Sequence, residues 1–382
     1  MRIAIFSEVY WPMVSGVGVT LDKLTSALQA RGHAVRVYSA TFPLPPGSPD
    51  RPEVHRSPGI PLFVYPDLQW AFPRQREIVA DLALFRPDVV HLATEFAVGL
   101  AGLKAARQLG VPMVASAHTD YQKYAGRYGL GFVLQLAWIY MRWFYDHAER
   151  VLVPSRVYER YLNSRGVRHT GLWSRGVDPE EFHPRFRSEG YRARFGVGPT
   201  DLLVTYIGRL AREKDLERLI SAWTALLERR GNAQLVLVGQ GPLGEDIRAR
   251  AIPGVHVAGL LTGRELSEAY ASADLFVFPS PTETFGNSLL EAMGSGLPAL
   301  AVRAGGVLDY ARHDENAWLA PAHDTGALTE ALRRLLSDAG LRGRLAQGAL
   351  ATAAARTWNA IYDDLISEYQ RAATVGRRTR AA

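Results

Sequence analysis

The order of apolar and polar residues along the chain predicts alternating strands and helices. Short apolar runs, typical of strands that are buried on both faces, recur, and helical patterns separate most of them. The predicted strands cover residues 2–6, 33–39, 62–65, 89–92, 151–154, 202–207, 234–238, 255–260, 275–278 and 299–302, and one more ends at His118. The main predicted helices cover residues 20–31, 98–109, 127–145, 325–337 and 341–359. This alternation predicts an α/β protein with parallel sheets.

The composition is that of a globular chain without cysteine. Hydrophobic residues make up 47% and charged residues 21% of the 382 positions, and no apolar run reaches the roughly 20 residues of a membrane span. The absence of cysteine excludes disulfides, thiolate metal sites and a cysteine nucleophile. Glu8 comes too early for a signal peptide, so we expect a cytoplasmic protein. Peripheral attachment to the inner face of the membrane is the alternative location.

Positive charge is concentrated in the first half of the chain. Residues 1–195 hold 24 of the 44 Lys and Arg residues but 17 of the 38 Asp and Glu residues, which gives them a net charge of +7. Such an excess is typical of proteins that bind nucleic acid, an acidic substrate or an anionic membrane surface. No basic run is interleaved with aromatic residues in the manner of a nucleic-acid site, so no nucleic-acid partner is expected.

The segment Arg127–Tyr145 is an unusual predicted helix because it is apolar nearly all round. It contains Trp138, Tyr140 and Trp143, with an arginine near each end. One interpretation is a core helix of the N-terminal domain. The other is a surface that enters the membrane interface, where Trp and Tyr are stable and arginines meet anionic headgroups. A lipid acceptor would explain both this surface and the positive charge.

Residues 274–298 combine the end of a strand with the start of a helix. The apolar run at 275–278 stops at Pro279, and a helix is expected to begin near Gly286 or Asn287, with Asn287 and Ser288 as capping residues. The first N–H groups of that helix would then point outward at the carboxyl end of a sheet. A helix start in this position favours a bound anion.

Two glutamates bracket this helix start. Glu283 lies in the loop, and Glu291 lies eight residues later, about two turns into the helix. The spacing would place one carboxylate at the helix mouth and the other on the flank, where it can accept vicinal hydroxyls of a sugar or a ribose. The alternative is a solvated Glu283 and an ordinary surface contact for Glu291. The apolar neighbours of Glu291 argue against that alternative.

A known family matches this stretch. Residues 279–287, Pro-Ser-Pro-Thr-Glu-Thr-Phe-Gly-Asn, and residues 289–298, Leu-Leu-Glu-Ala-Met-Gly-Ser-Gly-Leu-Pro, resemble the donor-binding signature of glycosyltransferase family 4. The members of this family are retaining enzymes of the GT-B fold, and the resemblance covers nearly the whole chain. Residues 171–184 resemble the start of the linker in its glycolipid-forming mannosyl, glucosyl and sulfoquinovosyl transferases.

The resemblance implies two doubly wound, Rossmann-like domains whose parallel sheets face each other across a cleft. We expect the acceptor-side domain to cover residues 1–185, an irregular charged linker residues 186–199, and the domain that binds the nucleotide sugar residues 200–357. Residues 358–382 are expected to form a C-terminal helix that returns to the first domain, followed by a basic tail.

The family pattern also implies roles for individual residues. Arg209 and Lys214, five residues apart in a strand-to-helix loop, match the element G-R-x-x-x-x-K and are expected to stabilise the leaving diphosphate. His118, at the end of a strand, is expected to lie against the donor sugar at the reacting centre. Glu283 is expected to bind hydroxyls of the transferred sugar, and Glu291 those of the ribose.

Further donor contacts are expected from glycines and from the helix start. Gly16, in a strand-to-helix loop with Gly18, corresponds to the family's loop facing the donor diphosphate. Gly239 and Gly241 form a close-approach loop beside the nucleotide. The last contacts come from backbone N–H groups of Phe285, Gly286 and Asn287.

The implied activity is the transfer of a hexose, with GDP-mannose as the first choice of donor, to a lipid or glycolipid acceptor. UDP-glucose, UDP-galactose and UDP-sulfoquinovose remain open as donors, and a soluble sugar remains open as acceptor. No Asp-x-Asp occurs in the chain, so neither a metal nor another cofactor is expected. With Glu291 assigned to ribose no clear nucleophile remains, so retention is expected to occur by same-face attack.

Three rival classes share parts of this pattern. A dinucleotide oxidoreductase would need a third glycine where Leu21 stands. A nucleotide-sugar epimerase would turn over the donor without an acceptor. A catalytically silent nucleotide-sugar-binding protein would bind the donor and transfer nothing.

Overall fold

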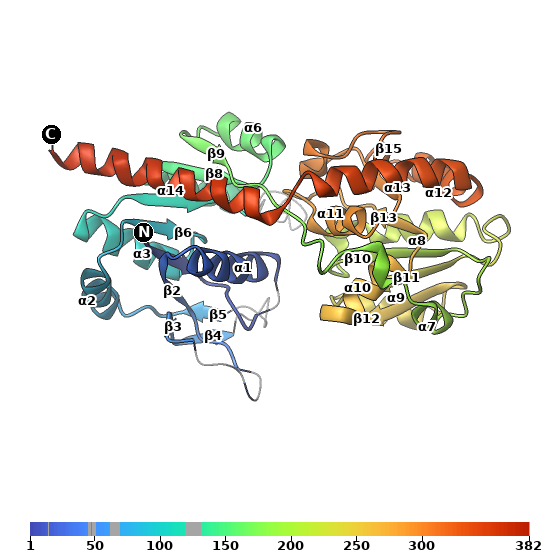
Figure 1. The fold of residues 1–382 in the computed structure, drawn as a ribbon, viewed down its shortest axis with the longest axis horizontal. Coiled ribbons are helices and arrows are strands. Elements are labelled where there is room, and N and C mark those ends of the chain that lie inside the picture. The colour runs from blue at the N-terminus through green and yellow to red at the C-terminus, as the bar shows by residue number, and fades with distance from the viewer. Residues whose placement is uncertain (14, 45–46, 48–50, 62–68, 119–130, 382) are drawn as a thin grey trace. The chain divides into compact units, whose positions relative to one another are not determined.

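The computed structural model describes residues 1–13, 15–44, 47, 51–61, 69–118 and 131–381, and only the backbone of 131–134 and 376–381. It divides into two compact units (Figure 1). Unit 1 comprises Met1–Ser174 and Asn359–Ala382, and unit 2 comprises Arg175–Trp358. The strand predicted at 62–65 and the first residues of the helix predicted at 127–145 lie outside the described residues.

Unit 1 is built on a parallel sheet with the order β3-β2-β1-β6-β7-β8-β9. The strands are β1 Arg2–Ser7, β2 Ala34–Ala40, β3 Val54–Ser57, β6 Val89–Leu92, β7 Met113–Ser116, β8 Arg150–Val153 and β9 Thr170–Leu172. The helices are α1 Gly16–Ala30, α2 Gln75–Phe85, α3 Ala97–Leu109, α5 Gly131–Tyr145, α6 Arg156–Ser164 and α14 Trp358–Ala381. A separate antiparallel pair joins β4 Gly59–Pro61 to β5 Gln69–Ala71.

Unit 2 repeats this plan with a parallel sheet in the order β12-β11-β10-β13-β14-β15. The strands are β10 Leu203–Ile207, β11 Gln234–Val238, β12 Val255–Gly259, β13 Leu275–Phe278, β14 Ala299–Val302 and β15 Trp318–Ala320. The α-helices are α7 Glu189–Ala193, α8 Leu216–Thr224, α9 Gly244–Ala249, α10 Gly263–Ala271, α11 Asn287–Gly294, α12 Thr325–Ser337 and α13 Ala339–Ala354. Short 3₁₀ helices are η2 Pro184–Phe186, η3 Arg212–Lys214 and η4 Gly305–Asp309.

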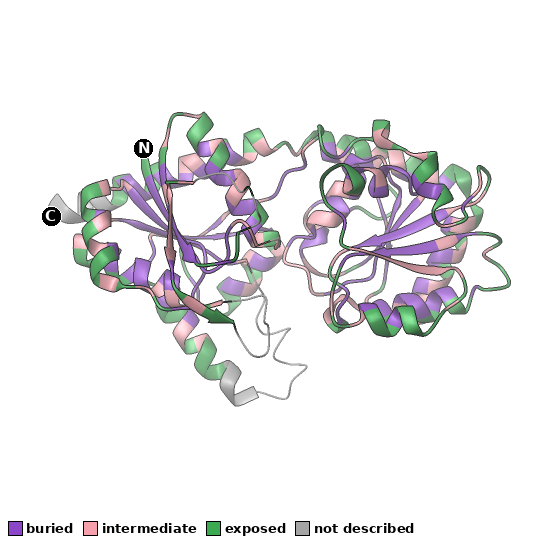
Figure 2. Cartoon of the chain, turned by 90° about the horizontal axis from the view of Figure 1, so that it is seen from below, coloured by how far each residue is buried: buried purple, intermediate pink, exposed green. Residues whose placement is uncertain are grey.

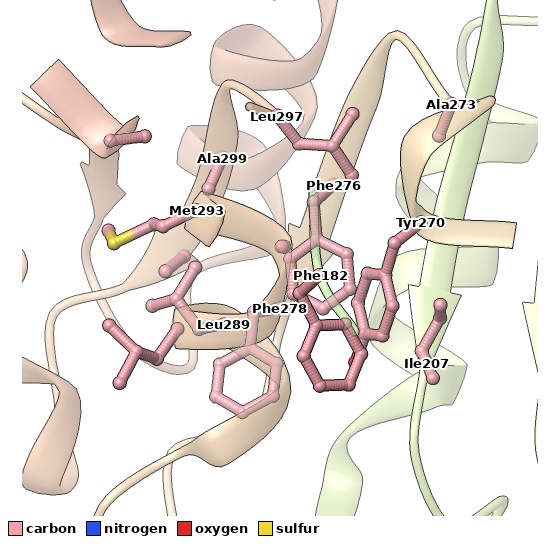
Figure 3. Close-up of a cluster of buried hydrophobic side chains, with 14 of the residues drawn as sticks. Phe182, Ile207, Tyr270, Ala273, Phe276, Phe278, Leu289, Met293, Leu297 and Ala299 are labelled. Atoms are coloured by element: carbon pink, nitrogen blue, oxygen red, sulfur yellow. The ribbon is translucent and has the colours of Figure 1, made fainter. Parts of the chain in front are cut away.

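Alternate residues of each central strand in unit 2 face two different helical layers. On β13, Phe276 and Phe278 belong to the apolar cluster that includes α10, α11 and α13, whereas Leu275 and Val277 belong to the cluster that includes α8 and α12. Figure 2 shows the strands buried and the helices buried along their inner faces. In Figure 3 the ring of Tyr270 lies beside those of Phe182 and Phe276, with centroid distances of 5.4 and 5.9 Å. The doubly wound α/β class predicted from the sequence is confirmed in both units.

The strand order reverses once in each sheet. The reversal lies between β1 and β6 in unit 1 and between β10 and β13 in unit 2. The loops that leave two adjacent strands at such a point diverge to opposite faces of the sheet, which opens space for a ligand at the carboxyl ends. The segments after β10 and β13 are the ones that hold most of the predicted donor-site residues.

Three sequence-based expectations on secondary structure were wrong. Helix α1 begins at Gly16, four residues before the predicted start, because the Ser15 hydroxyl accepts from the Gly18 N–H at 3.0 Å and caps it. Asn287 does not cap α11, since Gly286 occupies the cap position with φ of 93°. The connector expected to be irregular at 186–199 contains α7, and the buried Arg192 of α7 pairs with Asp274 at 2.7 Å.

Helix α14 extends through the basic residues expected to form a tail and ends at Ala381. Its inner face contacts unit 1, where Glu368 pairs with Arg150 of β8 at 2.8 Å and the Tyr369 hydroxyl lies 2.7 Å from His91 of β6. Among the helices over the described residues, none is both long and apolar enough to cross a membrane.

Candidate functional site

The loop after β10 carries two of the predicted cations of unit 2. Arg209 follows Gly208 directly after the strand, and the Tyr206 hydroxyl donates to the Arg209 carbonyl at 3.0 Å, which holds the start of the loop. Lys214 ends the 3₁₀ turn η3, and Asp215, with φ of 57°, leads from that turn into α8. Arg209 and Lys214 therefore leave the same strand end, as the sequence predicts.

The loop after β13 brings Glu283 against Lys214. The Lys214 Nζ and the Glu283 Oε1 atoms are 2.6 Å apart, and the two side chains are 16% and 18% exposed. The Thr282 hydroxyl donates to the Glu213 carbonyl at 3.1 Å and joins the same two loops a second time. Two residues that the sequence assigned to one site thus meet at the point where the strand order of unit 2 reverses.

The start of η4 supports the Glu283 loop from behind. The Gly306 N–H donates to the Glu283 carbonyl at 2.8 Å. A Cβ atom on Gly306 would lie 2.0 Å from the Thr284 carbonyl oxygen, so only glycine permits this approach. The backbone of residues 283–284 is therefore fixed by contacts that the sequence analysis did not identify.

The turn at Phe285 and Gly286 places the start of α11. Phe285 is buried, with its ring centroid 5.0 Å from that of Tyr310, so its side chain belongs to the core. The Tyr310 hydroxyl donates to the Gly286 carbonyl at 2.6 Å. Burial raises the pKa of Tyr310 well above its usual value, and the negative charge of Glu283 adds to this effect. Asn287, half-buried, is the first residue of α11.

Glu291 lies on the flank of α11 and is half-buried, with Tyr270 of α10 as a partner. The Tyr270 hydroxyl donates to Glu291 Oε2 at 2.8 Å. Burial raises the pKa of Tyr270 well above its usual value, and the charge of Glu291 raises it further, so the hydroxyl stays protonated and remains a donor. Sequence reasoning missed Tyr270, because a tyrosine in an amphipathic helix carries no signal of this contact.

Gly239 and Gly241 make close backbone contacts with the Arg209 loop. Gly239 has φ of 136°, and a Cβ atom on it would lie 1.9 Å from the Gly208 carbonyl oxygen. On Gly241, with φ of 154°, the corresponding distance to the Leu210 carbonyl oxygen is 2.4 Å. Both glycines thus allow the loop after β11 to pack against the loop after β10. Their contact with a nucleotide stays a prediction.

Gly16 and His118, the predicted site residues of unit 1, lie at the carboxyl side of its sheet. Gly16 opens α1, and a Cβ atom on it would meet no heavy atom of the described residues within 4 Å. His118 follows β7 and is half-buried. Its Nε2 lies 2.8 Å from Ser116 Oγ, and its ring stands edge-on to Trp173 at a centroid distance of 5.3 Å.

The site residues therefore form two groups, one on each unit. In unit 2 the group joins a cation, a carboxylate and the start of a helix, which is a combination that can bind a phosphate and hydroxyl groups together. In the part of the chain that the structure describes, no three His, Asp or Glu side chains are gathered to hold a metal ion.

Family comparisons agree with this division into two units. The model described as Glycosyltransferase Family 4 matches residues 14–181, and the model described as Glycosyl transferases group 1 matches residues 201–338.

Relatives match over most or all of the chain. A GDP-mannose-dependent alpha-mannosyltransferase of Mycolicibacterium smegmatis is 36% identical over 390 residues, covering 100% of both chains. An alpha-monoglucosyldiacylglycerol synthase of Streptococcus pneumoniae is 27% identical and covers 79% of this chain and 71% of its own. Among solved structures, a sucrose-phosphate synthase of Thermosynechococcus elongatus has a TM-score of 0.78 at 22% identity, covering 97% of this chain and 98% of its own.

Proposed function

Since the chain belongs to glycosyltransferase family 4 and has the GT-B fold, we propose that it transfers mannose from GDP-mannose to a lipid or glycolipid acceptor. The contact between Lys214 and Glu283 carries the chemical part of this proposal, because it joins a diphosphate-binding cation to a hydroxyl-binding carboxylate. The similarity to a GDP-mannose-dependent enzyme along the whole chain supports the choice of donor.

Charge develops on the diphosphate as the bond to the sugar breaks. Lys214 and Arg209 supply fixed positive charge for it, and the start of α11 adds backbone N–H donors. A lysine ammonium has three donors, so its pairing with Glu283 is compatible with a phosphate contact. The positive groups of the protein thus take the role that a divalent ion has in other transferases.

The two glutamates divide the hydroxyl groups of the donor. Glu283 binds hydroxyls of the transferred sugar, and Lys214 holds its carboxylate in place. Glu291 binds the ribose, with one oxygen oriented by Tyr270. Because this assignment provides no nucleophile, the acceptor attacks the face that the diphosphate leaves, and the departing phosphate takes its proton. The configuration of the sugar is therefore retained.

The exposed side of α5 supports a lipid acceptor. Leu136, Ile139 and Trp143 are 54%, 68% and 42% exposed and repeat at spacings of three and four residues, so they share one face of the helix. On the opposite side of α5, Met141, Phe144 and Tyr145 are buried, as expected for a helix that also packs on the core of unit 1. We infer that the exposed face enters an anionic membrane surface, because the apolar stripe lies in the half of the chain with a net charge of +7.

A panel of nucleotide sugars tests the donor. GDP-mannose at 100 times its Kd should stabilise the native state by about 2.7 kcal/mol, which a thermal shift detects. UDP-glucose, UDP-galactose and UDP-sulfoquinovose should give smaller thermal shifts. A larger shift with one of them than with GDP-mannose would identify that nucleotide sugar as the donor.

A transfer assay then separates an enzyme from a silent binding protein. Labelled sugar should move from the stabilising donor to vesicles that contain diacylglycerol and not to free mannose. Transfer to the free sugar would indicate a soluble acceptor. Binding of a donor without transfer to either acceptor would favour a catalytically silent protein.

A further inference from the structure

A buried histidine in unit 1 connects helix α14 with His118. His91 lies on β6 and is fully buried, and its two ring nitrogens meet different partners. The Nδ1 atom lies 2.7 Å from the Tyr369 hydroxyl, and the Nε2 atom lies 2.9 Å from Ser116 Oγ. Ser116 Oγ is in turn 2.8 Å from Nε2 of His118. These four side chains form one continuous hydrogen-bonded chain.

The hydroxyl of Tyr369 sets the direction of this chain. Tyr369 is fully buried, and His91 Nδ1 is the only hydrogen-bond partner of its hydroxyl among the described residues. If the hydroxyl accepted from Nδ1, its own proton would be buried without an acceptor, which is unfavourable. Tyr369 therefore donates to Nδ1 of His91.

The remaining protons follow from this first bond. Burial disfavours a charged imidazole, so a His91 that accepts at Nδ1 is neutral and carries its proton on Nε2. His91 Nε2–H then donates to Ser116 Oγ, and the Ser116 hydroxyl is left to donate to Nε2 of His118. Trp173 stands edge-on to both rings, at 5.4 Å from His91 and 5.3 Å from His118, and keeps their planes in place.

We propose that Tyr369, His91 and Ser116 are positioning residues that hold His118 in the neutral tautomer with its proton on Nδ1. This inference rests on the proposed function, in which His118 lies against the donor sugar. With Nε2 accepting from Ser116, the ring presents an N–H donor at Nδ1 and has no lone pair left to act as a base. Toward the donor sugar His118 can therefore act as a hydrogen-bond donor and not as a base, and helix α14 contributes to this state through Tyr369.

Nitrogen NMR of the full chain labelled with ¹⁵N-histidine tests the proton positions. In a neutral imidazole the protonated and unprotonated nitrogens resonate at well-separated shifts, and His118→Gln identifies the signals of His118. The wild type should show His118 protonated on Nδ1. In Tyr369→Phe and Ser116→Ala the signals should move toward a mixture of tautomers.

Tyr362→Phe is the matched control, because Tyr362 is buried on the same helix and its ring, with Arg31 5.5 Å from the centroid, is retained. This variant should leave the His118 signals unchanged. A wild-type His118 protonated on Nε2 would overturn the proposal. So would an unchanged tautomer in both Tyr369→Phe and Ser116→Ala.

Kinetics supply a second readout that separates positioning from general damage. Tyr369→Phe and Ser116→Ala should each lower kcat by about tenfold, the effect of one lost hydrogen bond, with the donor KM within about twofold. Ser116→Thr keeps the hydroxyl and should restore most of the rate. If the protein transfers no sugar from any donor, the proposed function fails. The NMR result still decides whether the chain of hydrogen bonds sets the tautomer of His118.

Discussion

The ion pair of Lys214 and Glu283 joins two loops that are 69 residues apart in the sequence. Both side chains are more than four-fifths buried, so each is only partly solvated when its partner is removed. Partial exposure limits the effect on stability to about 1–2 kcal/mol, between the values of surface and buried pairs. The larger effect should fall on the reaction, where both groups are assigned to the donor.

Lys214→Ala and Glu283→Ala should each lower turnover by about 100-fold or more, the scale of a lost electrostatic contact to a developing charge. Initial rates at saturating donor measure this, with the melting temperature as a check on folding. Lys104→Ala, at an exposed position of α3, is the matched control and should keep the full rate. Near-normal rates in both site variants would remove the pair from the reacting centre.

Tyr270→Phe should raise the donor KM by about tenfold, because a hydrogen bond to a charged carboxylate contributes about 1.5–3 kcal/mol. Steady-state kinetics with varied donor measure the change. Tyr191→Phe is the control, since the buried Tyr191 hydroxyl has no hydrogen-bond partner among the described residues. An unchanged KM in Tyr270→Phe would mean that Glu291 needs no orientation by this hydroxyl.

Residues in local motifs could be predicted from the sequence, whereas contacts between distant residues could not. The positions of Arg209, Lys214 and Glu283 in loops after β10 and β13 could be predicted, because each loop follows a recognisable strand and carries a known motif. Tyr270 and Tyr369 could not, because their partners Glu291 and His91 are separated from them by 21 and 278 residues. Such contacts depend on the packing of whole elements, which no local pattern contains.

Among the strands and helices, the buried central strands were predictable and the short edge strands were not. The central strands β1, β6, β10 and β13 consist mostly of apolar residues, which is typical of strands covered on both faces. The strands β3, β4, β5, β9 and β15 have only three or four residues each, and polar residues, glycine or proline interrupt most of them. The early start of α1 escaped prediction because glycines in a first turn resemble a loop.

Helix α1 offers a substitution that separates folding from binding. Gly16→Ala should leave the melting temperature unchanged or raise it, because the added Cβ meets no described atom and alanine favours a helix. Gly16→Ala should nevertheless weaken donor binding, measured by titration with GDP-mannose, if the diphosphate approaches this turn. Normal donor affinity in this variant would exclude Gly16 from the donor site.

Gly239→Ala provides the opposite case. Its Cβ would overlap the Gly208 carbonyl oxygen in a backbone conformation that disfavours alanine, so the melting temperature should fall by several degrees.

Helix α5 leads to a prediction about membranes. Ile139→Asp and Trp143→Ser should weaken co-sedimentation with phosphatidylglycerol vesicles by about tenfold or more, because each removes apolar surface from the exposed face. Leu84→Asp on α2 is the matched control, since Leu84 is 81% exposed but lies on a different helix. Equal loss in all three variants would mean that α5 has no special part in binding.

The two units are alike in their strand order, and the positive charges that the proposed function assigns to the diphosphate are side chains. We therefore expect activity to survive chelation. Treatment with EDTA, followed by gel filtration into metal-free buffer, should leave the transfer rate within about twofold, because in the proposed mechanism Arg209 and Lys214 take the place of a divalent ion. Loss of the rate and its recovery with magnesium would contradict this mechanism.

Unit 2 is one uninterrupted segment, whereas unit 1 is assembled from both ends of the chain. During synthesis the ribosome releases the first 174 residues long before it releases Tyr369. Until Tyr369 has been synthesised, the nascent first unit therefore lacks the contact between Tyr369 and Nδ1 of His91, although Ser116 is already present. Chains that stop before Tyr369 would contain both central sheets and yet lack the hydrogen bond from Tyr369 to His91, so under the proposal above they could not fix the tautomer of His118.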